Sequence, residues 1–95
     1  MFRVEQFQRT ERFDRDFRRL PPDIQAAVGD ALKHLIQHPL PSGLRHHTLS
    51  GHRPTVHVID VMSNHSWQLT FNMEGTTAVL LRVDTHRRID SNPKG

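Results

Sequence analysis

The hydrophobic pattern of this 95-residue chain changes its period once, at about Gly43, and this change constrains the fold more than any other feature. Before that point apolar residues recur every three or four positions, as on one side of a helix. After it they alternate in short runs rich in β-branched and aromatic side chains, as in strands. Ninety-five residues suffice for one hydrophobic core. The sequence therefore predicts a single α+β domain over residues 1–95.

The first half predicts a helical hairpin. The apolar residues from Phe13 to Leu20 recur at i, i+4 and i+7, which indicates a helix over about residues 10–20. Pro22 suits the first turn of a second helix, where a missing N–H costs nothing. The apolar stripe of this second helix ends at Ile36.

The second half predicts a small antiparallel β-meander that packs on the hairpin. Within the expected strand 67–73, Gln68, Thr70 and Asn72 alternate with apolar residues, so we expect them on a polar, accessible face. The tail from about residue 90 is expected to be disordered. Including a short N-terminal strand, the strands are expected at residues 1–7, 55–62, 67–73 and 77–83.

Two segments combine imidazoles with guanidinium groups: Leu44–Gly51 (LRHHTLSG) and Arg82–His86 (RVDTH). The net charge is +3, and residues 45–53 hold two arginines, three histidines and no acid. Such groups bind phosphates and transfer protons near neutral pH. If the fold brings the two segments together, they form a site for a phosphodiester.

Several other classes of protein are disfavoured. The chain has no cysteine, which excludes disulfides and thiolate chemistry, and its longest apolar run, 78–81, is too short to cross a membrane. The first residues lack the apolar stretch of a signal peptide, so a cytoplasmic location is expected. His34 and His38 have the i, i+4 spacing of metal ligands, but no third ligand is evident. We therefore expect no metal and no cofactor.

The motifs, in their order along the chain, resemble the RelE/ParE superfamily of bacterial type II toxins, and most closely its RelE-like and YafQ-like mRNA interferases. The resemblance covers residues 2 to about 90. It rests on FxxxFxxLP at 13–21, ALKHLIQHP at 31–39, LR and TLSG at 44–51, WQLTF at 67–71 and LLRVDTH at 80–86.

This resemblance implies a RelE/ParE-like fold, metal-independent cleavage of mRNA on the translating ribosome, and neutralisation by a cognate antitoxin. Such cleavage by the RNA's own 2′-hydroxyl requires a base, an acid and cationic donors. The implied catalytic residues are His47, His86 and Arg82. The implied substrate-binding residues are Arg45, His46, Arg53, His65, Trp67, Gln68 and Arg87.

Each assignment has a structural alternative. Arg82 lies four residues before His86, so on an extended strand both point to the same face; the alternative is a surface salt bridge with Asp84 or Asp90. His86 can instead cap the end of the sheet. His46 replaces His47 in the site if a bulge shifts the register. For Trp67, packing in the core is the favoured interpretation.

Three departures from the family pattern leave other functions open. Many RelE-like toxins have an arginine where this chain has Gln68, so one phosphate contact is lost or moved. Ser66 replaces an acid of YafQ-like toxins, and Ile89-Asp90 replaces a C-terminal aromatic. The alternatives are a ParE-like inhibitor of DNA gyrase, and a catalytically degenerate module that binds only an antitoxin.

Overall fold

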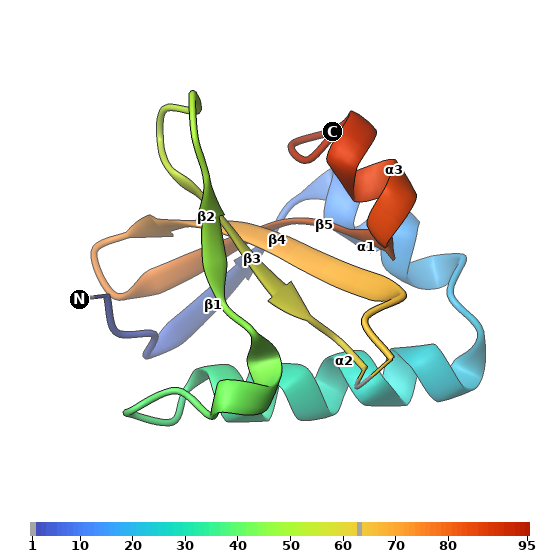
Figure 1. Cartoon of the computed structure of the whole chain (residues 1–95), viewed down its shortest axis with the longest axis horizontal. Coiled ribbons are helices and arrows are strands. Elements are labelled where there is room, and N and C mark those ends of the chain that lie inside the picture. Colours follow the sequence, from blue (N-terminus) through green and yellow to red (C-terminus); the bar gives the residue numbers. More distant parts are fainter. Residues whose placement is uncertain (1, 63) are drawn as a thin grey trace.

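The strands form one twisted five-stranded sheet in the computed structural model, which describes residues 2–62 and 64–95. The strand order is β1–β5–β4–β3–β2, with β1 parallel to β5 and the other neighbours antiparallel (Figure 1). This arrangement confirms the α+β class with its antiparallel meander. The elements are β1 (Gln6–Arg9), α1 (Glu11–Arg18), α2 (Pro22–Leu35), the 3-10 turn η1 (Ser42–Leu44), β2 (His47–Leu49), β3 (Val56–Asp60), β4 (Trp67–Glu74), β5 (Thr77–Thr85) and α3 (His86–Ser91).

Both predicted helices of the first half are confirmed, and local chemistry explains their limits. The hydroxyl of Thr10 accepts a hydrogen bond from the Phe13 amide at 3.1 Å and caps the start of α1. Helix α2 begins at Pro22 and has Asp23 in its first turn, where a carboxylate is favoured by the helix dipole. Its buried side chains follow the predicted stripe: Ile24, Val28, Ala31 and Leu35.

The main hydrophobic core lies between α2 and one face of the sheet. Strands β3, β4 and β5 contribute Ile59, Leu69, Phe71 and Leu80, all at most 1% exposed. A β-bulge at Thr70/Phe71 in the ladder between β4 and β5 leaves one residue of β5 without a partner. A bulge changes which face the later residues of a strand occupy. Leu80 before the bulge and Val83 after it therefore both reach the core.

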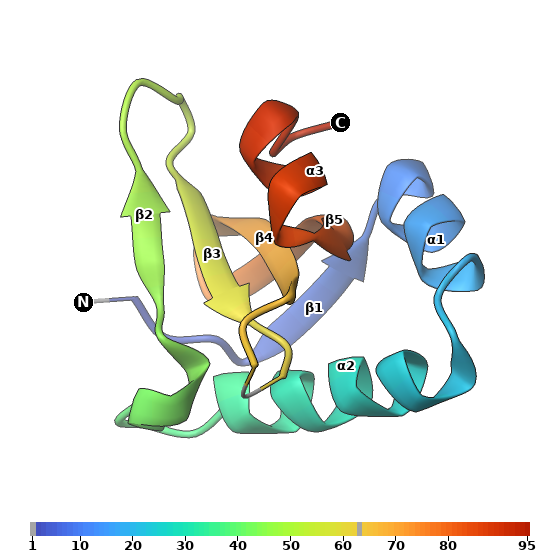
Figure 2. The same cartoon turned by 45° about the vertical axis from the view of Figure 1, so that its right-hand side comes forward.

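The opposite face of the sheet is not the open polar surface that alternation predicted. Helix α3 and the tail cover it, on the other side of the sheet from α2 (Figure 2). Ile89 of α3 is 1% exposed, and the hydroxyl of Thr70 donates to the Pro93 carbonyl at 2.7 Å. Gln68 and Thr70 are therefore buried, and that part of the prediction is wrong. The apolar Ile89 is what draws α3 onto this face.

The two ends of the chain also differ from expectation. The first strand is β1 at residues 6–9 rather than 1–7, because its backbone pairs with β5 from Gln6↔Thr77 onward; Met1 lies outside the described residues. The tail is not disordered from residue 90, since α3 continues to Ser91 and the next residues hydrogen-bond to the sheet. No described helix is long and apolar enough to span a membrane.

Candidate functional site

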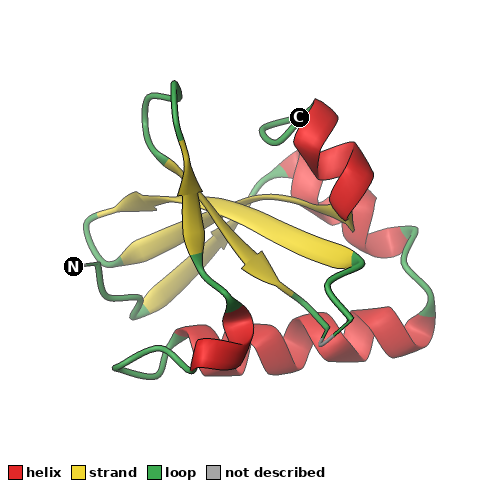
Figure 3. Ribbon diagram, in the orientation of Figure 1, coloured by secondary structure: helices red, strands yellow, loops and turns green. Residues whose placement is uncertain are grey.

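The two histidine-containing segments meet at one pocket on the α3 side of the sheet. Its volume is about 530 Å³, and it opens between β2, at the sheet edge, and the start of α3. The loop that joins β2 to β3 extends away from the body of the fold (Figure 3). The pocket is lined by Arg45, His46, His47, Asp60, His65, Gln68 and His86.

His47 reaches this pocket from the first position of β2, and a backbone carbonyl two residues earlier binds its ring. Arg45, two residues earlier, has a left-handed backbone with φ 49°, which is uncommon for a residue other than glycine. The Nδ1 of His47 lies 3.1 Å from the Arg45 carbonyl oxygen. A carbonyl only accepts, so Nδ1 carries the hydrogen in this bond, and in the neutral ring Nε2 has the lone pair.

Asp60, the last residue of β3, forms the floor of the pocket, and the sequence analysis missed it. It is 5% exposed, and its Oδ1 accepts a hydrogen bond from the Gln68 amide at 3.2 Å. Its Oδ2 lies 3.8 Å from the Arg45 Nε and 2.5 Å from the His65 Nδ1. A buried carboxylate requires such partners. The signal in the sequence was a single acid within the predicted strand 55–62, whose other residues are mostly apolar.

His86 reaches the pocket from the first residue of α3. Its backbone amide donates to the Ser66 carbonyl at 2.9 Å, which joins α3 to the loop before β4. Its exposed Nε2 lies 3.3 Å from Asp90, one helical turn later, and the two form an ion pair when the imidazole is protonated. His47 and His86 thus have different hydrogen-bonding environments at one pocket.

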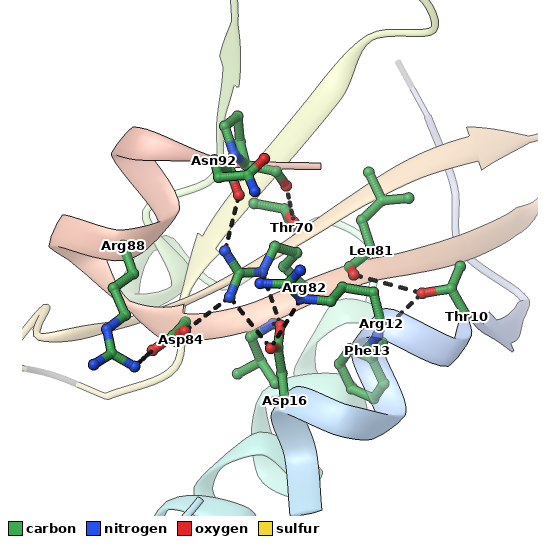
Figure 4. A network of polar contacts seen from close by, with 12 residues as sticks. Thr10, Arg12, Phe13, Asp16, Thr70, Leu81, Arg82, Asp84, Arg88 and Asn92 are labelled. Carbon is green, nitrogen blue, oxygen red and sulfur yellow. Dashed lines mark hydrogen bonds and ion pairs between the residues drawn. The ribbon is translucent and has the colours of Figure 1, made fainter. Parts of the chain in front are cut away.

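Arg82 is not among the residues that line the pocket, which corrects the expected placement. Strand β5 ends at Thr85 and the chain turns into α3, so Arg82 and His86 do not share the face of one strand. Arg82 is 3% exposed and donates to Asp16 of α1 at 2.9 and 3.2 Å and to Asp84 at 2.8 Å. The alternative salt bridge with Asp84 is present, but this ion pair and the one with Asp16 are buried and not on the surface (Figure 4).

The Arg82 network fixes the position of α3. Its Nη1 donates to the Asn92 carbonyl at 3.0 Å, so one side chain links α1, β5 and the end of α3 (Figure 4). The hydroxyl of Thr85 accepts from the Arg88 amide and caps the helix. Arg82 thereby helps to position α3, and with it His86, without lining the pocket.

The remaining predicted residues are distributed over several places. The ring of His46 packs against His57 on the α2 side of the sheet. Trp67 packs against the edge of the hydrophobic core, as favoured, and does not line the pocket. Arg53 lies in the loop between β2 and β3, and Arg87 is exposed on α3; neither lines the pocket. Gln68 lines the pocket, but it is buried and its side-chain amide donates to Asp60.

Four histidines, one guanidinium group and one buried carboxylate line the pocket, although the ring of His46 itself packs against His57. These groups suit an anionic substrate and proton transfer at two points. Within residues 2–62 and 64–95, no cluster of three or more His, Cys, Asp or Glu side chains is arranged to hold a metal ion.

The fold is that of the RelE/YafQ-like toxins of toxin–antitoxin systems. YafQ from E. coli superposes with a TM-score of 0.66 and 16% identity, over 90% of this chain and 97% of that chain. A chain of the toxin–antitoxin complex RelBE2 from Mycobacterium tuberculosis superposes with a TM-score of 0.62 and 24% identity. The match covers 87% of this chain and 99% of that chain. A chain of the E. coli DinJ–YafQ complex superposes with a TM-score of 0.65 and 17% identity, over 90% of this chain and 97% of that chain. No family model and no curated protein matches the sequence.

Proposed function

We propose that this protein is the toxin of a type II toxin–antitoxin system and cleaves mRNA on the translating ribosome. One observation carries the proposal: His47 and His86, 39 positions apart in the sequence, line the same pocket beside a buried carboxylate. The comparison with YafQ and RelBE2 supports the class of protein through the fold. Cleavage and its site are our proposal from the geometry.

His47 acts as the base in this proposal. Its Nε2 keeps a lone pair because Nδ1 is bound to the Arg45 carbonyl, and this lone pair takes the proton of a ribose 2′-hydroxyl. The 2′-oxygen then attacks the adjacent phosphorus, and the bond from phosphorus to the 5′-oxygen breaks. His86, which ion-pairs with Asp90 when it is protonated, donates its proton to the departing oxygen. No metal is required for these steps.

Arg45 replaces Arg82 as the proposed cationic donor. Its side chain lines the pocket and remains more than half exposed, at 61%, so the guanidinium is free to contact a phosphate. Asp60 contacts one side of Arg45 and of His65, which orients both side chains. Gln68 orients Asp60 through its amide. In this interpretation Gln68 supports the site from beneath instead of contacting RNA.

A cognate antitoxin is the proposed protein partner, and the cytoplasm, which contains the translating ribosomes, is the proposed location. Two of the similar structures, RelBE2 and a DinJ–YafQ structure, are toxin–antitoxin complexes. An acidic antitoxin segment that folds on contact would be attracted to the pocket's cations. Covering His47 and His86 would then block the substrate.

Induced expression in bacteria, followed by primer extension on mRNA, tests the proposal. We expect growth arrest and new 5′ ends within codons for the wild type, and loss of both for His47→Ala and His86→Ala. His34→Ala is the matched control, because this exposed histidine lies on α2. Growth arrest with an SOS response and intact mRNA would instead identify a gyrase inhibitor. Harmless expression with a stable antitoxin complex would identify a degenerate binding module.

A further inference from the structure

A pair of hydrogen-bonded imidazoles lies on the sheet face opposite the pocket. The Nε2 of His46 is 2.9 Å from the Nδ1 of His57, and the two rings stack with centroids 5.1 Å apart. Phe2 contacts both rings, at 4.7 Å from each, and Phe71 stacks on His57 at 4.9 Å. The imidazole pair is therefore enclosed partly by aromatic side chains.

This environment favours the uncharged pair. The hydrogen bond needs one nitrogen to donate and the other to accept, so it fails when both rings are protonated and two N–H groups face each other. Burial lowers the pKa of His46, and the charge of His47 lowers it further. The pKa of His57 is lowered by burial and then by the charge of His46.

The charged and titratable groups that line the groove beside the pair are basic, and the nearest acid among the pocket residues, Asp60, lies on the other face of the sheet beside Arg45. An adjoining groove of about 660 Å³ is lined by both members of the pair, by Arg45 and by His38, and its described lining contains no carboxylate. His47 is the next residue along the chain. No neighbouring acid in this groove compensates a positive charge on the pair.

The imidazole pair also anchors the segment that carries the proposed base. Strand β2 has three residues at the sheet edge, and the side chains of His47 and Thr48 are exposed. The side chains that hold the chain just before β2 are the buried Leu44 and the half-buried His46. Arg45, with its left-handed backbone, lies between these anchors, and its carbonyl binds the His47 ring. A displaced His46 therefore disturbs both Arg45 and His47.

We propose that His57 is a positioning residue that, through its hydrogen bond to His46, holds Arg45 and His47 in the geometry required at the pocket, and that protonation of both rings releases them. The effect on cleavage rests on the proposed function. The structural effect on Arg45 and His47 does not.

Three variants separate this role from simple packing. In His57→Gln, the amide can still hydrogen-bond to His46 but does not titrate. In His57→Phe, the ring volume is similar but the hydrogen bond is lost. His34→Gln is the control for removal of an exposed histidine that lines neither the pocket nor the groove beside the pair. Cleavage of mRNA on purified ribosomes is measured from pH 5.5 to 8, together with NMR spectra of the Arg45 and His47 backbone amides in the free protein.

We expect His57→Gln to retain activity within about threefold at pH 7.5 and to lose less of it on acidification than the wild type. Small displacements of catalytic groups reduce rates by up to about 10²-fold, so we expect His57→Phe to lose roughly 10- to 100-fold, in kcat more than in KM. In the wild type, acid shifts the Arg45 and His47 amide signals. These shifts are smaller in His57→Gln, in which one of the two paired imidazoles is gone.

Acid-induced shifts of the same size in the wild type and in His57→Gln would overturn the proposal, as would unchanged amide signals in His57→Phe. If the wild type cleaves no RNA, the proposed function fails, and the NMR comparison still decides whether the pair positions these residues.

Discussion

Replacement of Asp16 by alanine is expected to destabilise the fold strongly, because this residue is the main partner of a buried guanidinium. Asp16 is 5% exposed and accepts two hydrogen bonds from Arg82, at 2.9 and 3.2 Å, and one from the Val83 amide at 3.2 Å. Arg12 adds a further contact at 3.3 Å. The Asp16→Ala variant leaves Arg82 with Asp84 and the Asn92 carbonyl alone.

Breaking a buried ion pair from one side typically costs about 3–5 kcal/mol, and Asp16→Ala falls in this class. A domain of this size has a total stability of roughly 5–15 kcal/mol, so the loss is a large fraction of it. At about 4–8 °C per kcal/mol, a loss of about 3–5 kcal/mol should lower Tm by roughly 12–40 °C.

Urea unfolding, followed by circular dichroism, measures the change in the free energy of unfolding for Asp16→Ala. Asp14→Ala is the matched control on the same helix: its carboxylate is 39% exposed and pairs with Arg9 at 3.6 Å. Exposed pairs contribute about 0–1 kcal/mol. Equal stabilities of the two variants, within about 1 kcal/mol, would refute the reasoning that Arg82 depends on Asp16.

Three further predictions concern stability and the pocket. The pKa values of His46 and His57 are lowered in the folded protein, so the unfolded chain binds more protons at mildly acidic pH. The free energy of unfolding should therefore fall as pH drops below about 6.5. Urea titrations at several pH values should show a smaller fall for His57→Gln than for the wild type. Gln68→Leu removes the amide that binds Asp60 and should cost about 1–3 kcal/mol and lower cleavage, measured by unfolding and primer extension. Thr85→Ala removes the cap of α3 and should cost about 0.5–2 kcal/mol in the same unfolding assay.

The elements with strong periodicity could be predicted from the sequence, and the short ones could not. The stripe of α2 and the alternation in β3, β4 and β5 repeat over enough residues to indicate their type. Helix α3 has six residues, so its signal was limited to Thr85 as a cap and one apolar side chain, Ile89. The strand β2 has three residues and shows no usable period.

The site was predictable as far as residue chemistry and order along the chain allow. The expectation that the segments of His47 and His86 meet is confirmed, since both line one pocket. Arg82 was misplaced because its partner, Asp16, is 66 residues away and nothing local indicates the pair. Asp60 was missed because its importance comes from burial beneath the basic side chains, which is a property of the tertiary structure.

Primer extension on mRNA most directly tests catalysis at this pocket, after induced expression of the wild type, the His47→Ala/His86→Ala double variant and the His34→Ala control. We expect cleavage within codons for the wild type and the control, and none for the double variant at equal protein levels. Cleavage by the double variant at the wild-type level would contradict the assignment of catalysis to this pocket.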